Sequence, residues 1–127
     1  MVPVTILALA LHSRDVVKRL RRELALEYDC VERGILHFFS TAKDFDAAAS
    51  GVTLMRRHGV DRRVLSRDEV LKIEPALRSF GEHIAGGTYT ASDESGDACV
   101  FTQKLARLCQ QRGATFLYEH DILGFDA

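Results

Sequence analysis

Three carboxylates stand close together in the loop Asp93-Glu94-Ser95-Gly96-Asp97, and such side chains could bind a metal ion or transfer protons. A calcium loop of the EF-hand type places glycine sixth and a bidentate glutamate twelfth, whereas here glycine is fourth and no glutamate stands at the required distance. A catalytic carboxylate pair needs a second acid across a cleft, and nothing in the sequence places one there. The residues therefore assign this loop neither a metal ligand nor a catalytic group.

A third interpretation makes Asp97 the N-cap of a helix, because Phe101 and Leu105 recur at helical spacing after it. An aspartate before such a run accepts a hydrogen bond from the first turn, and the preceding acids lie near the positive end of the helix dipole. This account is sufficient for Asp97. It leaves Asp93 and the double glycine Gly86-Gly87 unexplained.

The histidines and cysteines form no motif of a known catalytic or metal site. There is no H-E-x-x-H, and His37 lies inside the apolar run 34–39, which predicts a core histidine in a buried strand. Cys30, Cys99 and Cys109 contain no C-x-x-C pair, so they indicate neither a disulfide framework nor a zinc site and favour a reducing, cytoplasmic setting. G-x-x-x-x-G-K-[ST] and G-x-S-x-G are also absent.

Size and charge indicate one soluble domain. The 127 residues carry 17 basic and 18 acidic side chains, so the net charge of -1 gives no argument for nucleic acid or an anionic membrane as partner. The apolar run Val2–Leu11 lacks the basic segment of a signal peptide and is about half as long as a membrane span. We expect it to be a buried lead-in to the first helix, or a core segment cut from a larger protein.

The periodicity of apolar residues predicts an alternation of helices and strands, which is a mixed α/β fold. Capping residues mark where the helices begin, and Pro75 ends the third of them. We expect helices that begin at Ser13, Thr41, Ser66 and about Cys99, and strands at 34–39, 64–65, 84–90, 115–118 and 122–125.

The stretch from Gly86 to Leu123 resembles the middle of the bacterial D-amino acid dehydrogenase small subunit, within the D-amino acid oxidase superfamily. That family shows a Gly-Gly strand, an Asp-Glu-(Ser/Thr)-Gly-Asp loop, then Phe-Thr and a helix ending in glycine. Matching positions upstream are Ser13-Arg14-Asp15, Gly34-Ile35-Leu36 and Ile73-Glu74-Pro75-Ala76-Leu77. The similarity runs from about Leu9 to Asp126, and the loop together with Glu-Pro-Ala-Leu is fairly specific.

For the fold, the resemblance implies part of a substrate-binding domain, with a mixed sheet and flanking helices. About 1–96 would belong to that domain, and about 97–127 would be a helix and strand that return to the FAD domain. The acidic loop would lie where the chain passes between the two domains. Gly86-Gly87 would allow close backbone packing.

For function, the resemblance implies oxidative deamination of a D-amino acid to a 2-oxo acid and ammonia, with FAD as hydride acceptor and a membrane electron acceptor. The intact enzyme would be cytoplasmic and peripheral to the inner membrane. The backbone of Ile122 is the one position carried over as cofactor-binding, near the adenine. The resemblance implies no catalytic residue in this stretch, because the catalytic residues of the family lie outside it.

The sequence departs from the family in lacking G-x-G-x-x-G, whose backbone N–H groups hold the FAD pyrophosphate. We therefore expect an internal piece of such an enzyme that alone binds no FAD and is inactive. One alternative is a non-catalytic interaction module of the same fold, which could form a homodimer through Val2–Leu11. Another is part of a flavoenzyme that resembles the glycine and sarcosine oxidases.

Overall fold

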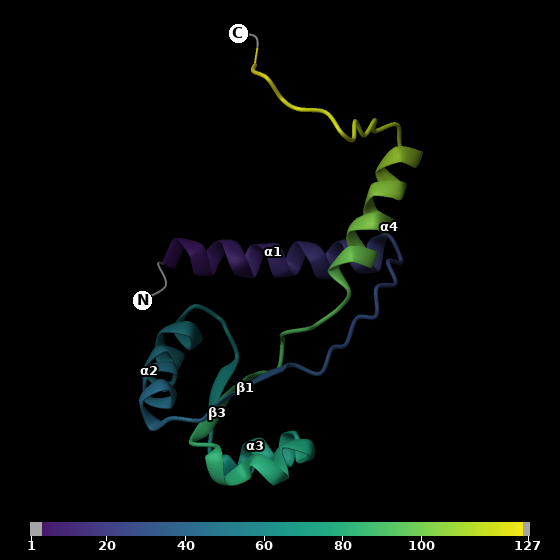
Figure 1. The fold of residues 1–127 in the computed structure, drawn as a ribbon. Helices are drawn as coiled ribbons and strands as arrows, with labels where there is room; N and C mark the ends of the chain where they lie inside the picture. The colour runs from purple at the N-terminus through teal and green to yellow at the C-terminus, as the bar shows by residue number, and fades with distance from the viewer. Residues whose placement is uncertain (1–3, 126–127) are drawn as a thin grey trace.

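The computed structural model describes residues 4–125. It contains a central antiparallel sheet, two helical segments on one face of the sheet, one helix on the other, and two outer helices (Figure 1). Helix α1 spans Val4–Glu23 and helix α4 spans Ala98–Gln111. The predicted combination of helices with strands is confirmed.

Strand β3 (Gly86–Thr90) lies in the middle of the sheet, between β1 (Ile35–Phe39) and β2 (Arg62–Leu65). Both pairings within the described residues are antiparallel, and Gly87 lies opposite Phe38 on one side and Leu65 on the other. The last strand in sequence therefore occupies the central position, which brings the double glycine into the middle of the sheet.

Helix α2 (Ala42–Arg57) covers one face of the sheet, and helix α3 (Arg67–Ile73) with the 3₁₀ segment η1 (Pro75–His83) covers the other (Figure 1). A Cβ on Gly86 would come within 2.6 Å of the Phe45 ring in α2, and one on Gly87 within 2.7 Å of the Val70 side chain in α3. Successive strand residues point to opposite faces of the sheet. The missing side chain of Gly86 therefore lets α2 pack closely on one face, and that of Gly87 lets α3 pack closely on the other. The predicted close packing at Gly86-Gly87 is confirmed.

The core lies between β2, β3 and the α3–η1 layer. Leu65, Val70 and Ile84 are at most 1% exposed. Thr88 and Thr90 of the central strand are also buried. Residues from β2 and β3, from α3 and from the junction before β3 thus close a small core.

The caps predicted at Thr41, Ser66 and Asp97 are found where the sequence places them. Ser66 and Glu69 form a reciprocal capping box at the start of α3, and Thr41 accepts a hydrogen bond from the Asp44 amide at the start of α2. Asp97 accepts a hydrogen bond of 2.9 Å from the Val100 amide, which confirms it as the N-cap of α4. These local predictions succeed because a cap satisfies amides of its own first turn.

The first helix differs from the prediction. It begins by Val4 instead of at Ser13, so the apolar run from Val4 onward is helical. Ile6 and Leu9 are 55% and 66% exposed, which contradicts a buried lead-in. The alternative, a core segment cut from a larger protein, stays a prediction. A run of apolar helix formers continues into the periodic stretch without a break, so a serine inside it does not start a new helix. Residues 2 and 3 of the predicted dimer segment lie outside the described residues.

The strands expected at 115–118 and 122–125 are absent, and the chain after α4 is an extended segment without secondary structure (Figure 1). Leu117, Leu123 and Phe125 are 71%, 97% and 92% exposed. A strand needs a neighbour to accept and donate its backbone hydrogen bonds, and no strand within the described residues lies beside this segment. The residue pattern of these two segments was therefore not sufficient to predict that they form strands.

Candidate functional site

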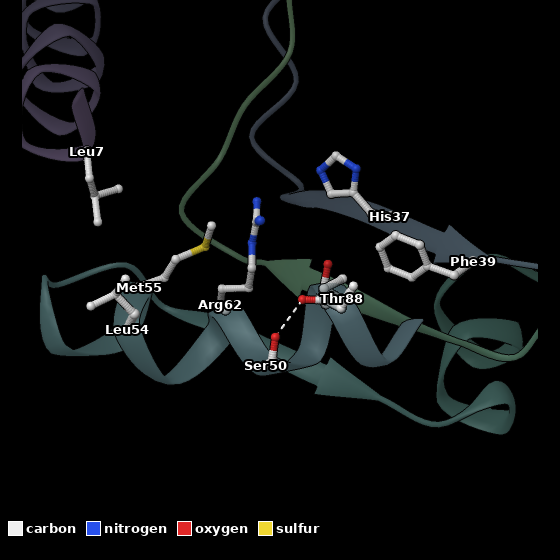
Figure 2. Close-up of a pocket in the computed structure, with 11 residues that line it drawn as sticks. Leu7, His37, Phe39, Ser50, Leu54, Met55, Arg62 and Thr88 are labelled. Atoms are coloured by element: carbon white, nitrogen blue, oxygen red, sulfur yellow. Dashed lines mark hydrogen bonds between the residues drawn. The ribbon is translucent and has the colours of Figure 1, made fainter. Parts of the chain in front are cut away.

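The largest described cavity, of about 570 Å³, lies between α1, α2 and one face of the sheet (Figure 2). Its walls are mostly apolar, and four polar side chains interrupt them. The lining residues are Leu7, His37, Phe39, Ala47, Ala48, Ser50, Gly51, Leu54, Met55, Arg62 and Thr88. An apolar cavity with a few polar groups is the usual form of a small-molecule site.

His37 is exposed on β1 and lines this cavity, so the prediction of a core histidine is wrong. The run 34–39 suggested burial because it is apolar throughout, yet β1 is an outer strand of the sheet. Its side chains alternate between the α2 face and the α3 face, and neither helix covers it completely. Exposure leaves the imidazole of His37 accessible to a ligand in the cavity.

Arg62 brings a positive charge to the same cavity from β2. Its Nε donates a hydrogen bond of 2.9 Å to Thr90 Oγ1, and this contact holds the side chain along the sheet. The guanidinium extends away from α2 (Figure 2). The other nitrogens of a guanidinium held in this way can donate to a carboxylate. Sequence reasoning missed Arg62, because Arg62 and Arg63 read as two charged residues before a short strand.

A smaller cavity of about 280 Å³ shares Leu7, Met55 and Arg62 with the first. Asp93 and Glu94 of the acidic loop also line it, together with Arg14 of α1. Acidic and basic side chains thus face one space beside an apolar one. This combination can accommodate a zwitterion with an apolar side chain.

Glu94 of the acidic loop is largely buried, with its side chain 11% exposed. Its Oε2 lies 3.2 Å from Arg21 Nη1 and 3.8 Å from Lys18 Nζ, both on α1. Its Oε1 accepts a hydrogen bond of 3.3 Å from the Tyr28 hydroxyl. The loop therefore contacts α1 through charges, which no motif in the sequence indicates.

Gly96 explains why the loop can lie this close to the segment after α1. A Cβ at this position would come within 2.5 Å of the Tyr28 ring. The Asp97 amide donates a hydrogen bond of 2.8 Å to the Tyr28 carbonyl, and Val31 and Ser95 exchange backbone hydrogen bonds. Segments 24–34 and 91–97 therefore run side by side between the outer helices and the sheet (Figure 1).

The charges around Arg21 shift the ionisation of their neighbours. Burial, then a hydrogen bond with Cys30 and the nearby charge of Glu94, raise the pKa of Tyr28 to about 12. The hydrogen bond of 2.6 Å from Arg21 lowers the pKa of Glu32. The same hydrogen bond is the largest influence on Arg21 and raises its pKa above the ordinary value. Arg21 also donates to the Cys30 thiol. At neutral pH this cluster therefore contains charged Arg21 and neutral Tyr28.

The structure brings no set of three or more histidine, cysteine, aspartate or glutamate side chains into metal-binding proximity among residues 4–125. Within the same residues, no helix has the length and apolar character to cross a bilayer. Ile122 is 79% exposed in the segment after α4, and its predicted contact with a cofactor stays a prediction. The predicted division at about residue 96 also stays a prediction.

The FAD implied by the resemblance finds no pyrophosphate cradle in residues 4–125. Such a cradle places the start of a helix after a strand and a glycine turn. Here the amino ends of α2, α3 and α4 are each capped by a side chain of this chain. An acid stands in the first turn of α2 and of α3, and the cap of α4 is itself an acid. Asp44, Glu69 and Asp97 would repel a pyrophosphate. The described residues thus do not fit that part of the cofactor.

The sequence is similar to those of several bacterial D-amino acid dehydrogenases. It is 45% identical over 113 residues to one from Dechloromonas aromatica, a match that covers 89% of this chain and 27% of that protein. It is 40% identical over 117 residues to one from Granulibacter bethesdensis, which covers 92% and 28%. The chain thus spans little more than a quarter of the length of these relatives.

The fold is similar to parts of two solved flavoenzyme structures. Glycine oxidase from Geobacillus kaustophilus matches with a TM-score of 0.73 and 27% identity, over 91% of this chain and 31% of that one. L-proline dehydrogenase from P. horikoshii matches with a TM-score of 0.75 at 18% identity, over 90% and 29%, and this match shows the fold alone. The family model described as FAD dependent oxidoreductase matches residues 3–127. The chain belongs to this FAD-dependent oxidoreductase family.

Proposed function

We propose that the chain forms the substrate-side portion of an FAD-dependent D-amino acid dehydrogenase, which converts D-amino acids to 2-oxo acids and ammonia. The observation that carries the proposal is the 45% identity over 113 residues to a D-amino acid dehydrogenase. That alignment covers 89% of the chain, so it includes most of the sheet, its helices and the acidic loop.

The chemistry of the two adjoining cavities supports this proposal. Arg62 offers a guanidinium to the substrate carboxylate, and His37 lies in the same cavity. Asp93 offers a carboxylate to the substrate ammonium in the adjoining space. The apolar walls then favour substrates with an apolar side chain.

FAD, when bound to the whole protein, supplies the hydride acceptor for this reaction. We propose that residues outside this chain hold its pyrophosphate, because the starts of α2, α3 and α4 carry acids. The purified 127-residue chain should then show no flavin absorbance and no turnover. Purification of yellow protein with flavin near stoichiometric amounts would contradict this part of the proposal.

The function can be tested by transplantation. The matching segment of the Dechloromonas aromatica D-amino acid dehydrogenase is replaced by this chain, and reduction of an artificial electron-acceptor dye is measured with D-alanine and D-phenylalanine. We expect the hybrid to bind FAD and to reduce the dye. A hybrid that folds and binds FAD but reduces no dye with any D-amino acid would refute the proposal.

Arg62→Met in the hybrid tests the carboxylate contact. Loss of a charge-assisted hydrogen bond should raise KM by about 10- to 100-fold. Arg63→Met is the matched control, because Arg63 is the next residue of β2 and lies over the Tyr89 ring instead of lining the cavity. Equal KM values for the two variants would show that Arg62 does not bind the substrate carboxylate.

The similarity to glycine oxidase favours a second candidate, a flavoenzyme acting on glycine or sarcosine. The same hybrid separates the two functions, since faster dye reduction with glycine or sarcosine than with D-amino acids would favour this candidate. The exposed apolar face of α1 favours a third, an interaction module that forms a homodimer. A monomer in sedimentation experiments at high concentration would count against the third.

The remaining parts of the proposal concern the whole enzyme. We propose that it acts in the cytoplasm, peripheral to the inner membrane, and passes its electrons to a membrane acceptor. Dye reduction that is replaced by quinone reduction when inner-membrane vesicles are added would support this assignment. Recovery of all activity in the soluble fraction, with no stimulation by such vesicles, would oppose it.

A further inference from the structure

Helix α1 forms a wall of both cavities, yet it is attached to the rest of the molecule mainly by polar side chains. Leu7 lines the two cavities, and Leu11 and Arg14 line the smaller one. The amides of Leu24 and Leu26 donate to carbonyls in the last turn of α1. No described backbone hydrogen bond joins α1 to another helix or strand. Figure 1 shows α1 lying beyond α2, across the molecule from α3.

Arg14 and Lys18 of α1 are attached to the loop after β3, and Arg21 is attached both to this loop and to Cys30 and Glu32. Arg14 Nη1 donates a hydrogen bond of 2.8 Å to Ser92 Oγ, and Lys18 Nζ donates one of 2.5 Å to the Ser92 carbonyl. Arg21 and Lys18 form the ion pairs with Glu94. Three successive turns of one helix face therefore contact a stretch of three residues.

Glu94 is the more buried of the two carboxylates that pair with Arg21, with its side chain 11% exposed against 58% for Glu32. Its Oε2 is fully buried and has no hydrogen-bond partner among the described residues, so the charges of Arg21 and Lys18 are its only compensation there. Removing one partner of a buried ion pair leaves an uncompensated charge, which is far more disruptive than losing an exposed pair.

The chain after α1 has the geometry of a hinge. Ala25 adopts φ of 48°, a left-handed conformation that costs free energy in a residue with a Cβ. Leu26 and Tyr28 are then buried, and from Tyr28 onward the segment is fixed to the acidic loop. Rotation at 24–25 would move α1 while the paired segments stay in place, once the hydrogen bonds of Arg21 to Glu32 and Cys30 and of the Leu26 amide to the Arg21 carbonyl are broken.

We propose that α1 is a latched wall of the cavity, with the ion pairs of Glu94 to Arg21 and Lys18 as the latch and residues 24–25 as the hinge. Closed, the latch holds Leu7 against the cavity. Opened, it lets the first turns of α1 move away and admits a ligand or solvent. The inference goes beyond the proposed function, since it does not depend on which substrate the cavity accepts.

A tryptophan placed at the cavity wall tests the latch in the purified chain. The sequence contains no tryptophan, so Leu7→Trp introduces a single fluorescent reporter. In this background, Glu94→Gln should shift the emission to the red and raise acrylamide quenching towards that of an exposed indole. Asp15→Asn is the matched control, because it also removes one negative charge from an ion pair on α1. That pair, with Arg14, is at the surface, and the Asp15 side chain is 69% exposed. This substitution should leave both signals unchanged.

Hydrogen exchange separates release of α1 from loss of the fold. Glu94→Gln should accelerate amide exchange within α1 by about 100-fold, because removing one partner of a buried pair is that disruptive and a released helix frays. Amides of β3 should exchange as in the parent chain. Lys18→Gln, which keeps the closer pair with Arg21, should give a smaller change of the same kind.

Two results would overturn the proposal. Unchanged quenching and exchange in Glu94→Gln would show that the ion pairs do not hold α1. Equal acceleration in α1 and β3, in both Glu94→Gln and Lys18→Gln, would show that these contacts support the whole fold instead of a movable wall.

Discussion

The sheet with its packed helices and the outer helix α1 are held in place by different interactions. Leu65, Val70 and Ile84 are at most 1% exposed, whereas Ile6 and Leu9 of α1 are more than half exposed. The sheet unit is stabilised by burial of apolar surface, while α1 is attached through Arg14, Lys18 and Arg21. The free energy gained by burying apolar surface depends on close packing and little on charge. The free energy of an ion pair depends mainly on the charges of its partners. The two regions should therefore respond to different substitutions.

The largest effect should come from emptying the core of the sheet unit. Leu65→Ala should lower the free energy of unfolding by about 3 kcal/mol, because a buried leucine loses its packing and leaves a cavity. Leu123→Ala is the control, since Leu123 is 97% exposed, and it should change stability little. Urea unfolding followed by circular dichroism measures both. Similar losses would mean that the segment after α4 is packed in solution.

A smaller effect should follow from filling the space that the central glycine leaves. Gly87→Ala should cost about 2 kcal/mol, because its Cβ would lie 2.7 Å from Val70 and 2.8 Å from the His37 carbonyl. Gly51→Ala in α2 meets no atom within 4 Å and should instead stabilise by about 0.5–1 kcal/mol, because alanine favours helix. Thermal unfolding distinguishes the opposite signs. A neutral Gly87→Ala would show that the two layers can move apart.

Two N-cap substitutions sharpen the contrast between inner and outer helices. Ser66→Ala should lower the global stability by about 1 kcal/mol, because α3 packs on the core through Val70. Asp97→Ala removes a cap of similar strength from α4, about 1 kcal/mol, but should act locally. Amide exchange should rise within α4 and not in β3. Matching changes in β3 for both variants would show that α4 belongs to the same cooperative unit.

The last two effects appear only when the pH changes, and the first of them concerns the cluster that holds α1. The pKa of Tyr28, raised to about 12 by burial, means that the folded chain retains a proton that the unfolded chain loses near 10. The stabilising contribution is thus complete below about pH 10 and is lost as pH rises towards 12. Absorbance titration of the chain and of Tyr28→Phe measures this group by difference. A tyrosine that titrates near 10 would indicate an open cluster.

Acid should affect a different contact of the same region. The hydrogen bonds from Ser92 lower the pKa of Asp61. A lowered pKa gives stability that is present above the unfolded value, near 4, and is lost as pH falls through the folded value. Asp61→Asn should therefore reduce the pH dependence of stability below about pH 4. An unchanged acid profile would exclude this carboxylate as a contributor.

Local signals in the sequence predicted most of the elements correctly. The caps at Thr41, Ser66 and Asp97, the stop at Pro75 and the close packing at Gly86-Gly87 depend on neighbours in the chain or on the absence of a side chain. The resemblance in the acidic loop also indicated the family that the full comparison confirmed. Each of these features is written in a few consecutive residues.

The errors have a common physical cause. The burial expected for His37 and for the apolar run before Ser13, and the strands expected after α4, all depend on what lies beside these segments. An apolar strand at the edge of a sheet is exposed, and an alternating segment without a partner is not a strand. Periodicity describes how a segment could pack, and the neighbour decides whether it does.

The amino-acid sequence by itself determined the starts of α2, α3 and α4, the glycine positions and the family. Only the tertiary structure decided that Arg62 and His37 line one cavity and that Glu94 lies against Arg21 and Lys18. These residues are brought together by the antiparallel pairing of β3 with both of its neighbours and by the paired segments after α1. Contacts between residues far apart in the chain depend on this pairing, so no local pattern in the sequence could encode them.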